Sequence, residues 1–188
     1  MEAIIFDCDG TLADTMPAHY ISWRETLRPY GIDFPEERFW AMGGYSAEAI
    51  VGVLAREQGK TVDAHKVGME KDASFDRYLP NVRPIEEVVA VARQHLGKIP
   101  MAVATGGTRA FCTEVLTRLE ILHWFDAIVT AEDVPQGKPA PDIFQEAARL
   151  LNVDPGQCVV YEDTDPGIDG ARRAGMAYVD VRQLRHTE

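Results

Sequence analysis

Carboxylate side chains follow two apolar runs of this sequence, at the point where each run ends. One run, over residues 3–6, leads into Asp7 and Asp9, and a second run leads into Glu162 and Asp163. Continuous apolar runs of this length are typical of buried strands in a parallel sheet. Because parallel strands present their carboxyl ends at one edge of a doubly wound sheet, the four carboxylates are expected to meet there.

A hydroxyl group and a lysine are predicted to reach the same edge. Thr105 follows the apolar run over residues 101–104, and Lys138 precedes a helical pattern that starts near Pro141. Carboxylates gathered so closely repel each other unless a cation joins them, and Mg²⁺ prefers oxygen ligands of this kind. Mg²⁺ and Lys138 can neutralise phosphoryl oxygens, Thr105 can donate to one, and a carboxylate can attack phosphorus. The chemistry predicted is magnesium-dependent phosphoryl transfer.

Strand and helix patterns alternate through most of the chain, which favours a doubly wound α/β fold. Further apolar runs follow the first one, and helical patterns lie between most of them. The predicted strands are residues 3–6, 101–104, 127–129, 158–161 and 177–181. We predict a five-stranded parallel, Rossmann-like sheet with strand order 3-2-1-4-5.

The stretch between the first and second runs breaks this alternation, because its apolar residues recur only at helical spacing. Ser46 is a candidate N-cap for one of these helices and Gly59 a candidate stop. We therefore predict a helical cap domain, residues 15–81, inserted into a core domain formed by residues 1–14 and 82–188.

The composition indicates which partners are disfavoured and in which cellular compartment the protein is expected. Thirty acidic residues against nineteen basic ones give a net charge of −11, which opposes binding to nucleic acid or to anionic membranes. No apolar run approaches the ~20 residues that span a bilayer. The three cysteines are few and widely spaced, as in a reducing compartment. A cytoplasmic protein is expected, and a monomer, since no feature of the sequence suggests an obligate interface.

Four segments, in order along the chain, resemble the motifs of the haloacid dehalogenase superfamily. Residues 7–15, DCDGTLADT, resemble its first motif, DxDGT(L/V)xDT, and Thr105 occupies the second. Residues 137–142, GKPAPD, resemble the third motif, and residues 161–163, YED, belong to the fourth. The resemblance covers essentially the whole chain. It implies an enzyme that hydrolyses phosphoric monoesters.

The resemblance implies a catalytic role for four residues. Asp7 corresponds to the nucleophile that forms an aspartyl-phosphate. Asp9 corresponds to a general acid that later acts as a base. Thr105 corresponds to a ligand of a phosphoryl oxygen, and Lys138 to the residue that holds both nucleophile and phosphate.

It also implies a Mg²⁺ site. Asp7 is expected to bind the metal through its side chain and Asp9 through its backbone carbonyl. Asp163 is expected to be a ligand as well, with Glu162 as a direct or water-bridged partner. For Asp165 two interpretations stay open, a supporting residue of the site and an acidic residue that begins a helix.

Within the superfamily, the helical insertion resembles the cap of the β-phosphoglucomutase-like subfamily. The short length resembles that of its compact bacterial phosphatases, which act on fructose 1-phosphate or 6-phosphogluconate. The expected partner is thus a small sugar phosphate. Substrate contacts are expected from Tyr45, Ser46, Gly106 and Arg109. His19 lies near the hinge, where it either orients a group or relays a proton, or is simply a packed or surface histidine.

Other activities of the superfamily fit the sequence less well. A mutase needs an arginine in the cap loop to hold a second phosphate; residues 44–48, GYSAE, contain none, although Arg109 could replace it. A phosphonatase needs a reactive lysine near the hinge, whereas Lys60, Lys66 and Lys71 have the pattern of solvated charges. Dehalogenases lack the metal and the equivalent of Asp9.

A regulatory domain that accepts a phosphoryl group is the alternative from another class of protein. Such receiver domains also gather aspartates, a threonine and a lysine around Mg²⁺ on a doubly wound sheet. They lack an inserted cap and the second aspartate of the Asp-x-Asp pair, so the sequence favours the enzyme.

Overall fold

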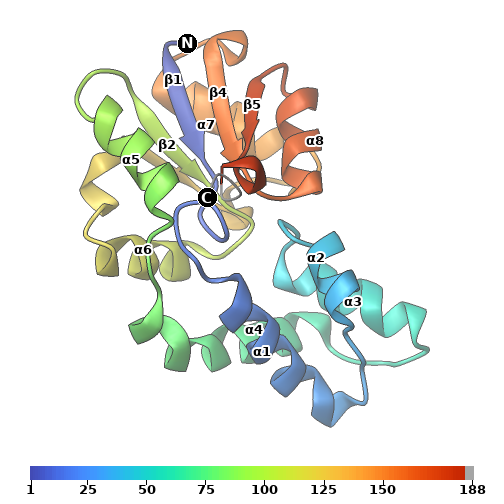
Figure 1. Ribbon diagram of the computed structural model, residues 1–188. Coiled ribbons are helices and arrows are strands. Elements are labelled where there is room, and N and C mark those ends of the chain that lie inside the picture. Colours follow the sequence, from blue (N-terminus) through green and yellow to red (C-terminus); the bar gives the residue numbers. More distant parts are fainter. Residues whose placement is uncertain (185–188) are drawn as a thin grey trace.

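The computed structural model describes residues 1–184, and its centre is a five-stranded parallel sheet (Figure 1). The strand order β3-β2-β1-β4-β5 confirms the predicted order. The strands are β1 (Ala3–Phe6), β2 (Met101–Ala104), β3 (Ala127–Val129), β4 (Cys158–Glu162) and β5 (Ala177–Asp180). β1 pairs with β2 on one side and with β4 on the other, so the chain segments that follow these three strands lie next to one another.

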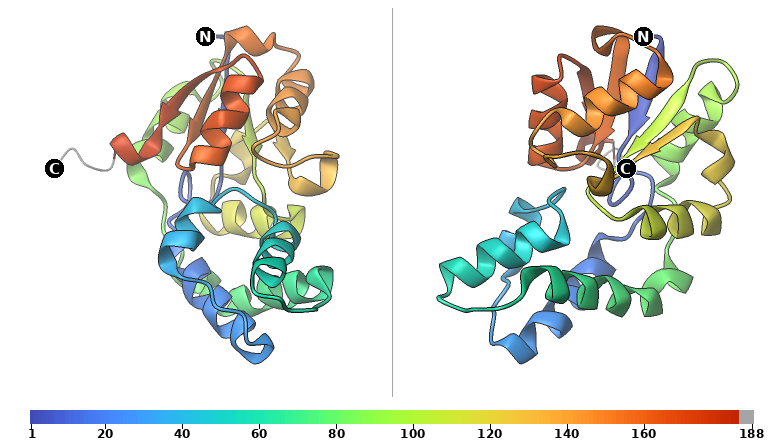
Figure 2. Two further views of the ribbon diagram at one scale, coloured as in Figure 1. Left: turned by 90° about the vertical axis from the view of Figure 1, so that its right-hand side faces the viewer. Right: turned by 180° about the vertical axis from the view of Figure 1, so that it is seen from behind.

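Helices follow the strands and cover both faces of the sheet (Figure 2). The helices are α1 (Met16–Leu27), α2 (Glu36–Ala41), α3 (Ala47–Glu57), α4 (Ala64–Phe75), α5 (Glu86–His95), α6 (Arg109–Arg118), α7 (Asp142–Leu151) and α8 (Asp165–Arg173). Short 3-10 segments are η1 (Arg28–Tyr30), η2 (Asp76–Asn81), η3 (Leu122–Trp124), η4 (Ala131–Asp133), η5 (Pro155–Gln157) and η6 (Val181–Gln183).

Successive side chains of β1 point to opposite faces of the sheet and enter two separate hydrophobic clusters. Ile4 and Phe6 pack with buried residues of α5 and α6. Ala3 and Ile5 pack with buried residues of α7 and α8. Because both faces are covered, β1 is apolar throughout its length, as the continuous run in the sequence indicated.

Two helices that begin close to the carboxyl edge have threonine N-caps. The Thr108 side chain accepts from the Phe111 N–H at the start of α6, and the Thr164 side chain accepts from the Gly167 N–H at the start of α8. These caps satisfy backbone donors that a helix leaves free in its first turn. The first turns of both helices are thus ordered where the candidate site residues gather.

Helices α1 to α4 form the segment between β1 and β2, and they pack around a third hydrophobic cluster that includes Trp23, Leu27 and Leu54. Ser46 caps α3 through a bond from the Ala49 N–H, as the sequence predicted. The short helix α2 was not predicted, because its six residues are too few to display a periodicity.

The two-domain division stays a prediction, and we refer to residues 15–81 as the cap segment. Phe75 and Leu79, at the end of this segment, belong to the cluster beneath α5 and α6 rather than to the cap cluster. Residues 185–188 of the predicted core domain lie outside the described residues. Within residues 1–184, no helix combines the length and the apolar character needed to cross a bilayer.

Replacing Ile5 by Ala tests the contribution of the central strand. Ile5 is fully buried, so Ile5→Ala is expected to lower the free energy of unfolding by about 2–5 kcal/mol. Two costs add up in this variant, because apolar burial is lost and a cavity is left behind. Ile21→Ala is the matched control, because Ile21 is 48% exposed and its removal is expected to change stability by only about 0.5 kcal/mol. Urea unfolding of both variants checks this, and equal losses would contradict the proposed packing.

Candidate active site

Lys138 lies between two carboxylates at the carboxyl edge of the sheet. Its Nζ donates to Asp7 Oδ1 at 2.6 Å and to Glu162 Oε2 at 2.7 Å. The Lys138 side chain is fully buried, and Asp7 and Glu162 are buried as well. A buried ammonium group needs such partners, since an unpaired one loses several kcal/mol of hydration free energy. The three residues therefore form a single charged unit that orients the Asp7 carboxylate.

The second oxygen of Glu162 is held by Thr164. Glu162 Oε1 accepts from the Thr164 hydroxyl at 2.6 Å and from the Thr164 N–H at 3.0 Å. A side chain at Gly167 would overlap the Glu162 carboxylate, so only glycine leaves room for it. Both Glu162 oxygens thus have donors, which suits Glu162 to fixing Lys138.

Asp163 approaches the loop after β1 from the neighbouring strand. Its Oδ1 accepts from the Thr11 hydroxyl at 3.1 Å. Gly10 has φ of +83°, and a Cβ there would overlap the Asp163 carboxylate. Glycine at this position therefore serves both the left-handed backbone conformation and the close approach of Asp163.

The crowding of carboxylates raises two of their pKa values. Burial raises the pKa of Asp7 well above its ordinary value, and the charge of Glu162 adds to this while Lys138 opposes it. Burial and Glu162 also raise the pKa of Asp163, to about 7. Charges of one sign at short range in a poorly hydrated place favour protonation unless a cation offsets them.

These carboxylates fit a divalent metal ion. One oxygen each from Asp7, Glu162 and Asp163 lies within 4.8 Å of the other two. An all-oxygen donor set suits Mg²⁺, which is bound through one or two carboxylates with water and substrate oxygens completing its shell. Because donors already occupy both Glu162 oxygens, Asp7 and Asp163 are the better candidates for direct ligands.

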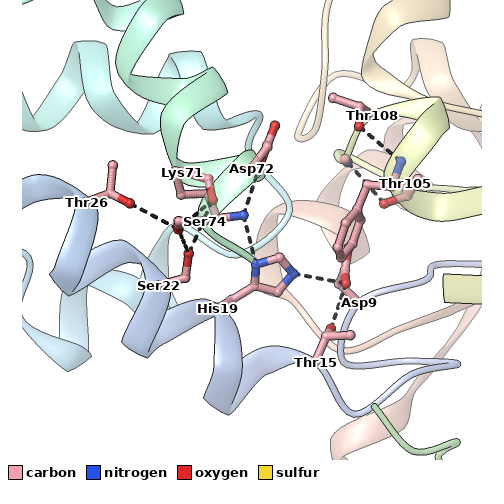
Figure 3. A network of polar contacts seen from close by, with 12 residues as sticks. Asp9, Thr15, His19, Ser22, Thr26, Lys71, Asp72, Ser74, Thr105 and Thr108 are labelled. Carbon is pink, nitrogen blue, oxygen red and sulfur yellow. Dashed lines mark hydrogen bonds and ion pairs between the residues drawn. The ribbon is translucent and has the colours of Figure 1, made fainter. Parts of the chain in front are cut away.

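The Asp9 side chain lies beside Thr15 and His19 of the cap segment (Figure 3). Its Oδ1 accepts from the Thr15 hydroxyl at 2.6 Å and lies 3.1 Å from His19 Nε2. Burial alone would raise the pKa of Asp9, but the contacts with His19 and Thr15 outweigh this and lower it. Asp9 is therefore held as a carboxylate by Thr15 and His19, whereas the Asp7 carboxylate is held by Lys138. His19 is a packed histidine, stacked against Phe75 and bonded to Asp9, and its role in orienting a group or relaying a proton stays a prediction.

The prediction that Lys71 is a solvated charge was wrong. Lys71 is only 5% exposed, and its Nζ lies 2.8 Å from His19 Nδ1 and 3.2 Å from Asp72 Oδ1 (Figure 3). A protonated lysine can only donate, so His19 Nδ1 must accept and its Nε2–H faces Asp9. Burial, reinforced by the charge of Lys71, lowers the pKa of His19, which keeps the ring neutral. Spacing in the sequence carried no signal for this contact, since residues 19 and 71 lie on different helices.

A cavity of about 400 Å³ opens between this cluster and the cap segment. The predicted residues Asp7, Asp9, His19, Tyr45, Ser46, Thr105 and Gly106 all line it. A Cβ at Gly106 would overlap the carbonyl of Gly44, so the cap loop and the loop after β2 are in close backbone contact. Thr105 is buried, and its Oγ1 accepts from the Gly107 N–H at 3.1 Å.

Arg109 and Asp165 belong neither to the cavity lining nor to the buried cluster of Asp7, Lys138, Glu162 and Asp163. Arg109 donates to Ile128 O at 3.1 Å and to Asp133 Oδ2 at 2.6 Å, and it is not a lining residue. Asp165 begins α8 and pairs with Arg182 at 2.8 Å, with 85% of its side chain exposed. Asp165 is therefore better described as an acidic residue that begins a helix than as a residue that supports the acidic cluster.

Comparison with known proteins gives consistent matches along most of the chain. A family model described as haloacid dehalogenase-like hydrolase matches residues 1–175. The chain is 41% identical over 182 residues to the fructose-1-phosphate phosphatase of Escherichia coli, with 96% of each protein covered. It is 33% identical to a phosphorylated carbohydrates phosphatase of Thermotoga maritima, covering 94% of this chain and 82% of that protein. The solved β-phosphoglucomutase of Clostridium difficile has a TM-score of 0.84 at 27% identity, covering 98% of this chain and 87% of that one.

Replacing Asp163 by Asn tests the crowding of the cluster. The pKa of Asp163 is about 7 in the folded chain and about 3.9 when unfolded, so the folded state binds the proton more tightly. Protonation of Asp163 therefore stabilises the folded state. This contribution is fully present below pH 4 and is lost as the pH rises through 7. Without metal, Asp163→Asn should therefore gain stability relative to wild type between pH 5 and pH 8, by more than about 1.4 kcal/mol, one pKa unit.

Thermal unfolding of both proteins at the two pH values measures this difference. Mg²⁺ should raise the Tm of the wild type more than that of the variant, because the variant lacks one carboxylate ligand. If the stability difference between the two proteins is the same at pH 5 and pH 8, the carboxylates are not crowded as described. If Mg²⁺ raises the Tm of both proteins equally, Asp163 is not a metal ligand.

Proposed function

Because this chain belongs to the haloacid dehalogenase-like hydrolase family, we propose that it is a magnesium-dependent phosphatase of small sugar phosphates. The observation that carries the proposal is the Asp7 carboxylate, which lines the cavity while Lys138 orients it from behind. The names of the similar phosphatases from Escherichia coli and Thermotoga maritima support a phosphorylated carbohydrate as the substrate.

In the first step Asp7 attacks phosphorus and the bond to the sugar oxygen breaks. Lys138 neutralises charge on the phosphoryl group while it holds the nucleophile, and Thr105 donates to a phosphoryl oxygen. The products are an aspartyl-phosphate on Asp7 and the free sugar alcohol, whose oxygen receives a proton from the minor, protonated form of Asp9. Asp7, Asp163 and the Asp9 carbonyl would hold a Mg²⁺ ion, which would supply positive charge to the phosphoryl oxygens.

In the second step water attacks the aspartyl-phosphate and regenerates the Asp7 carboxylate. Asp9 removes a proton from this water, which restores the proton that it delivered to the leaving group. The contacts of Asp9 with Thr15 and His19 lower its pKa and so favour the form that acts as a base. The same residue thus serves both steps, in opposite directions.

The cap segment supports the first transfer by limiting water at Asp7. Gly44 contacts the loop after β2, and both line the cavity. Because attack by Asp7 and attack by water compete for the same phosphorus, excluding water while the substrate is bound favours the covalent route. The cap segment must then move enough for water to enter.

A panel of phosphate esters tests the function directly. Phosphate release from fructose 1-phosphate, 6-phosphogluconate, β-glucose 1-phosphate and p-nitrophenyl phosphate is measured with and without Mg²⁺. Magnesium-dependent release from one or more sugar phosphates is expected. Conversion of β-glucose 1-phosphate to glucose 6-phosphate without release would instead indicate a mutase, the activity of the Clostridium difficile neighbour. A protein that is phosphorylated but hydrolyses no free ester would be a regulatory module.

Asp7→Asn is expected to lower kcat by at least about 10³-fold, because the amide cannot form the phosphorylated intermediate. The fold should persist, since Asn occupies the same volume, and circular dichroism checks this. Residual activity of more than a few per cent in a pure preparation would contradict the assignment of Asp7 as nucleophile.

Lys71→Met is expected to lower kcat about 10- to 100-fold, because it releases the His19 ring that orients Asp9. The charge of Lys71 lowers the pKa of both His19 and Asp9, so its loss should also move the pH profile of kcat to higher pH. Lys66→Met is the matched control on the same helix, with 68% of its side chain exposed, and should stay within about twofold of wild type. Equal effects of the two substitutions, or an unmoved profile, would show that Lys71 only packs.

A further inference from the structure

The basic side chains of the cap segment that line the cavity already have acidic partners. His65 Nδ1 lies 3.1 Å from Glu48 Oε2, and Lys71 Nζ lies 3.2 Å from Asp72 Oδ1. The remaining one, His19, faces Asp9. Among the described lining residues, no cation of this segment is left to bind a second anionic group of a ligand.

The start of helix α3 also faces the cavity, since Ser46, Ala47 and Glu48 line it. A helix N-terminus ordinarily attracts anions, because its first N–H groups point outward and its dipole is positive there. Here Glu48 places a carboxylate in the first turn, and the Ser46 side chain accepts from the Ala49 N–H. The Glu48 N–H itself packs against Gly68, so the positive end of α3 is largely compensated.

The balance of charge at this end of the cavity is therefore negative. Glu48 and Asp72 contribute two negative charges and Lys71 one positive charge, while the ring of His65 adds a charge only when it is protonated. Carboxylates of this kind accept hydrogen bonds from hydroxyl groups, whereas an anionic group facing them is repelled.

We propose that the cap end of the cavity selects monophosphates of neutral polyols and rejects substrates that carry a second anionic group, with Glu48 as the specificity-determining residue. This inference rests on the proposed phosphatase function and deepens it. Hydroxyl groups of the sugar donate to Glu48 and Asp72, and the exposed Met69 adds an apolar side chain to the same lining. A carboxylate or a second phosphate at the far end of the substrate meets Glu48 instead. It finds no unpaired cation among the described lining residues of the cap segment.

Two matched pairs of substrates isolate the charge. Glucitol 6-phosphate and 6-phosphogluconate share a six-carbon open chain and differ at C1, where an alcohol replaces a carboxylate. Fructose 1-phosphate and fructose 1,6-bisphosphate differ by the second phosphate. In each pair the neutral-tailed ester is expected to have a kcat/KM at least about fivefold higher, the factor that a unit charge about 4 Å away produces in water-like surroundings. Measurement near 0.15 M ionic strength screens the distant surface charge.

Glu48→Gln should shrink both ratios about fivefold, because it removes the charge and keeps the hydrogen-bonding shape. Glu57→Gln is the matched control: it removes one charge and one ion pair, with Arg38, from the same helix, but Glu57 does not line the cavity. It should leave both ratios unchanged. Ratios near one in the wild type, or ratios that Glu48→Gln and Glu57→Gln change equally, would overturn the inference while leaving the phosphatase function standing. Absence of phosphate release from all four esters would refute the proposed function and this inference with it.

Discussion

Lys138 donates to Asp7 and Glu162 from a position that solvent does not reach, and its charge determines which neighbouring groups can stay ionised. Burial alone would lower the pKa of Lys138, but the charges of Asp7 and Glu162 raise it instead. Removing Lys138 from this unit would leave two buried carboxylates without their cation, and uncompensated buried charge costs about 3–5 kcal/mol. Lys138, Asp7 and Glu162 therefore depend on each other, and the sheet edge that carries them has to bring strands β1 and β4 side by side.

Thr164 connects this charged unit to the cap segment. Its hydroxyl holds Glu162 and caps α8, while its other face meets the cap loop, since a Cβ on Gly43 or Gly44 would contact the Thr164 side chain. The cap segment also reaches Asp9 through His19 and Lys71. The position of the cap is thus linked to both carboxylates of the proposed chemistry, to Asp7 through Lys138 and to Asp9 through His19. A cap that packs correctly presents both carboxylates to the same cavity.

The sequence predicted the strands because buried parallel strands leave uninterrupted apolar runs, and it predicted most of the helices because they leave their own periodicity. It also predicted that Asp7, Thr105, Lys138 and Asp163 follow or precede those elements at one edge. What it could not predict are contacts between helices of the cap segment. Lys71 looks like a surface charge along α4, and only the packing of α1 against α4 places it beside His19. Arg109 likewise stands near Thr105 in sequence, yet Asp133 and Ile128 hold its side chain.

The central claim is that Asp7 attacks phosphorus before water does, and the stereochemistry at phosphorus tests it most directly. A sugar phosphate whose phosphorus is made chiral with oxygen isotopes is hydrolysed, and the configuration of the phosphate released is determined. Attack by Asp7 followed by attack of water is two in-line displacements, so the account predicts net retention of configuration. Net inversion would mean a single displacement by water, and would contradict the assignment of Asp7 as nucleophile.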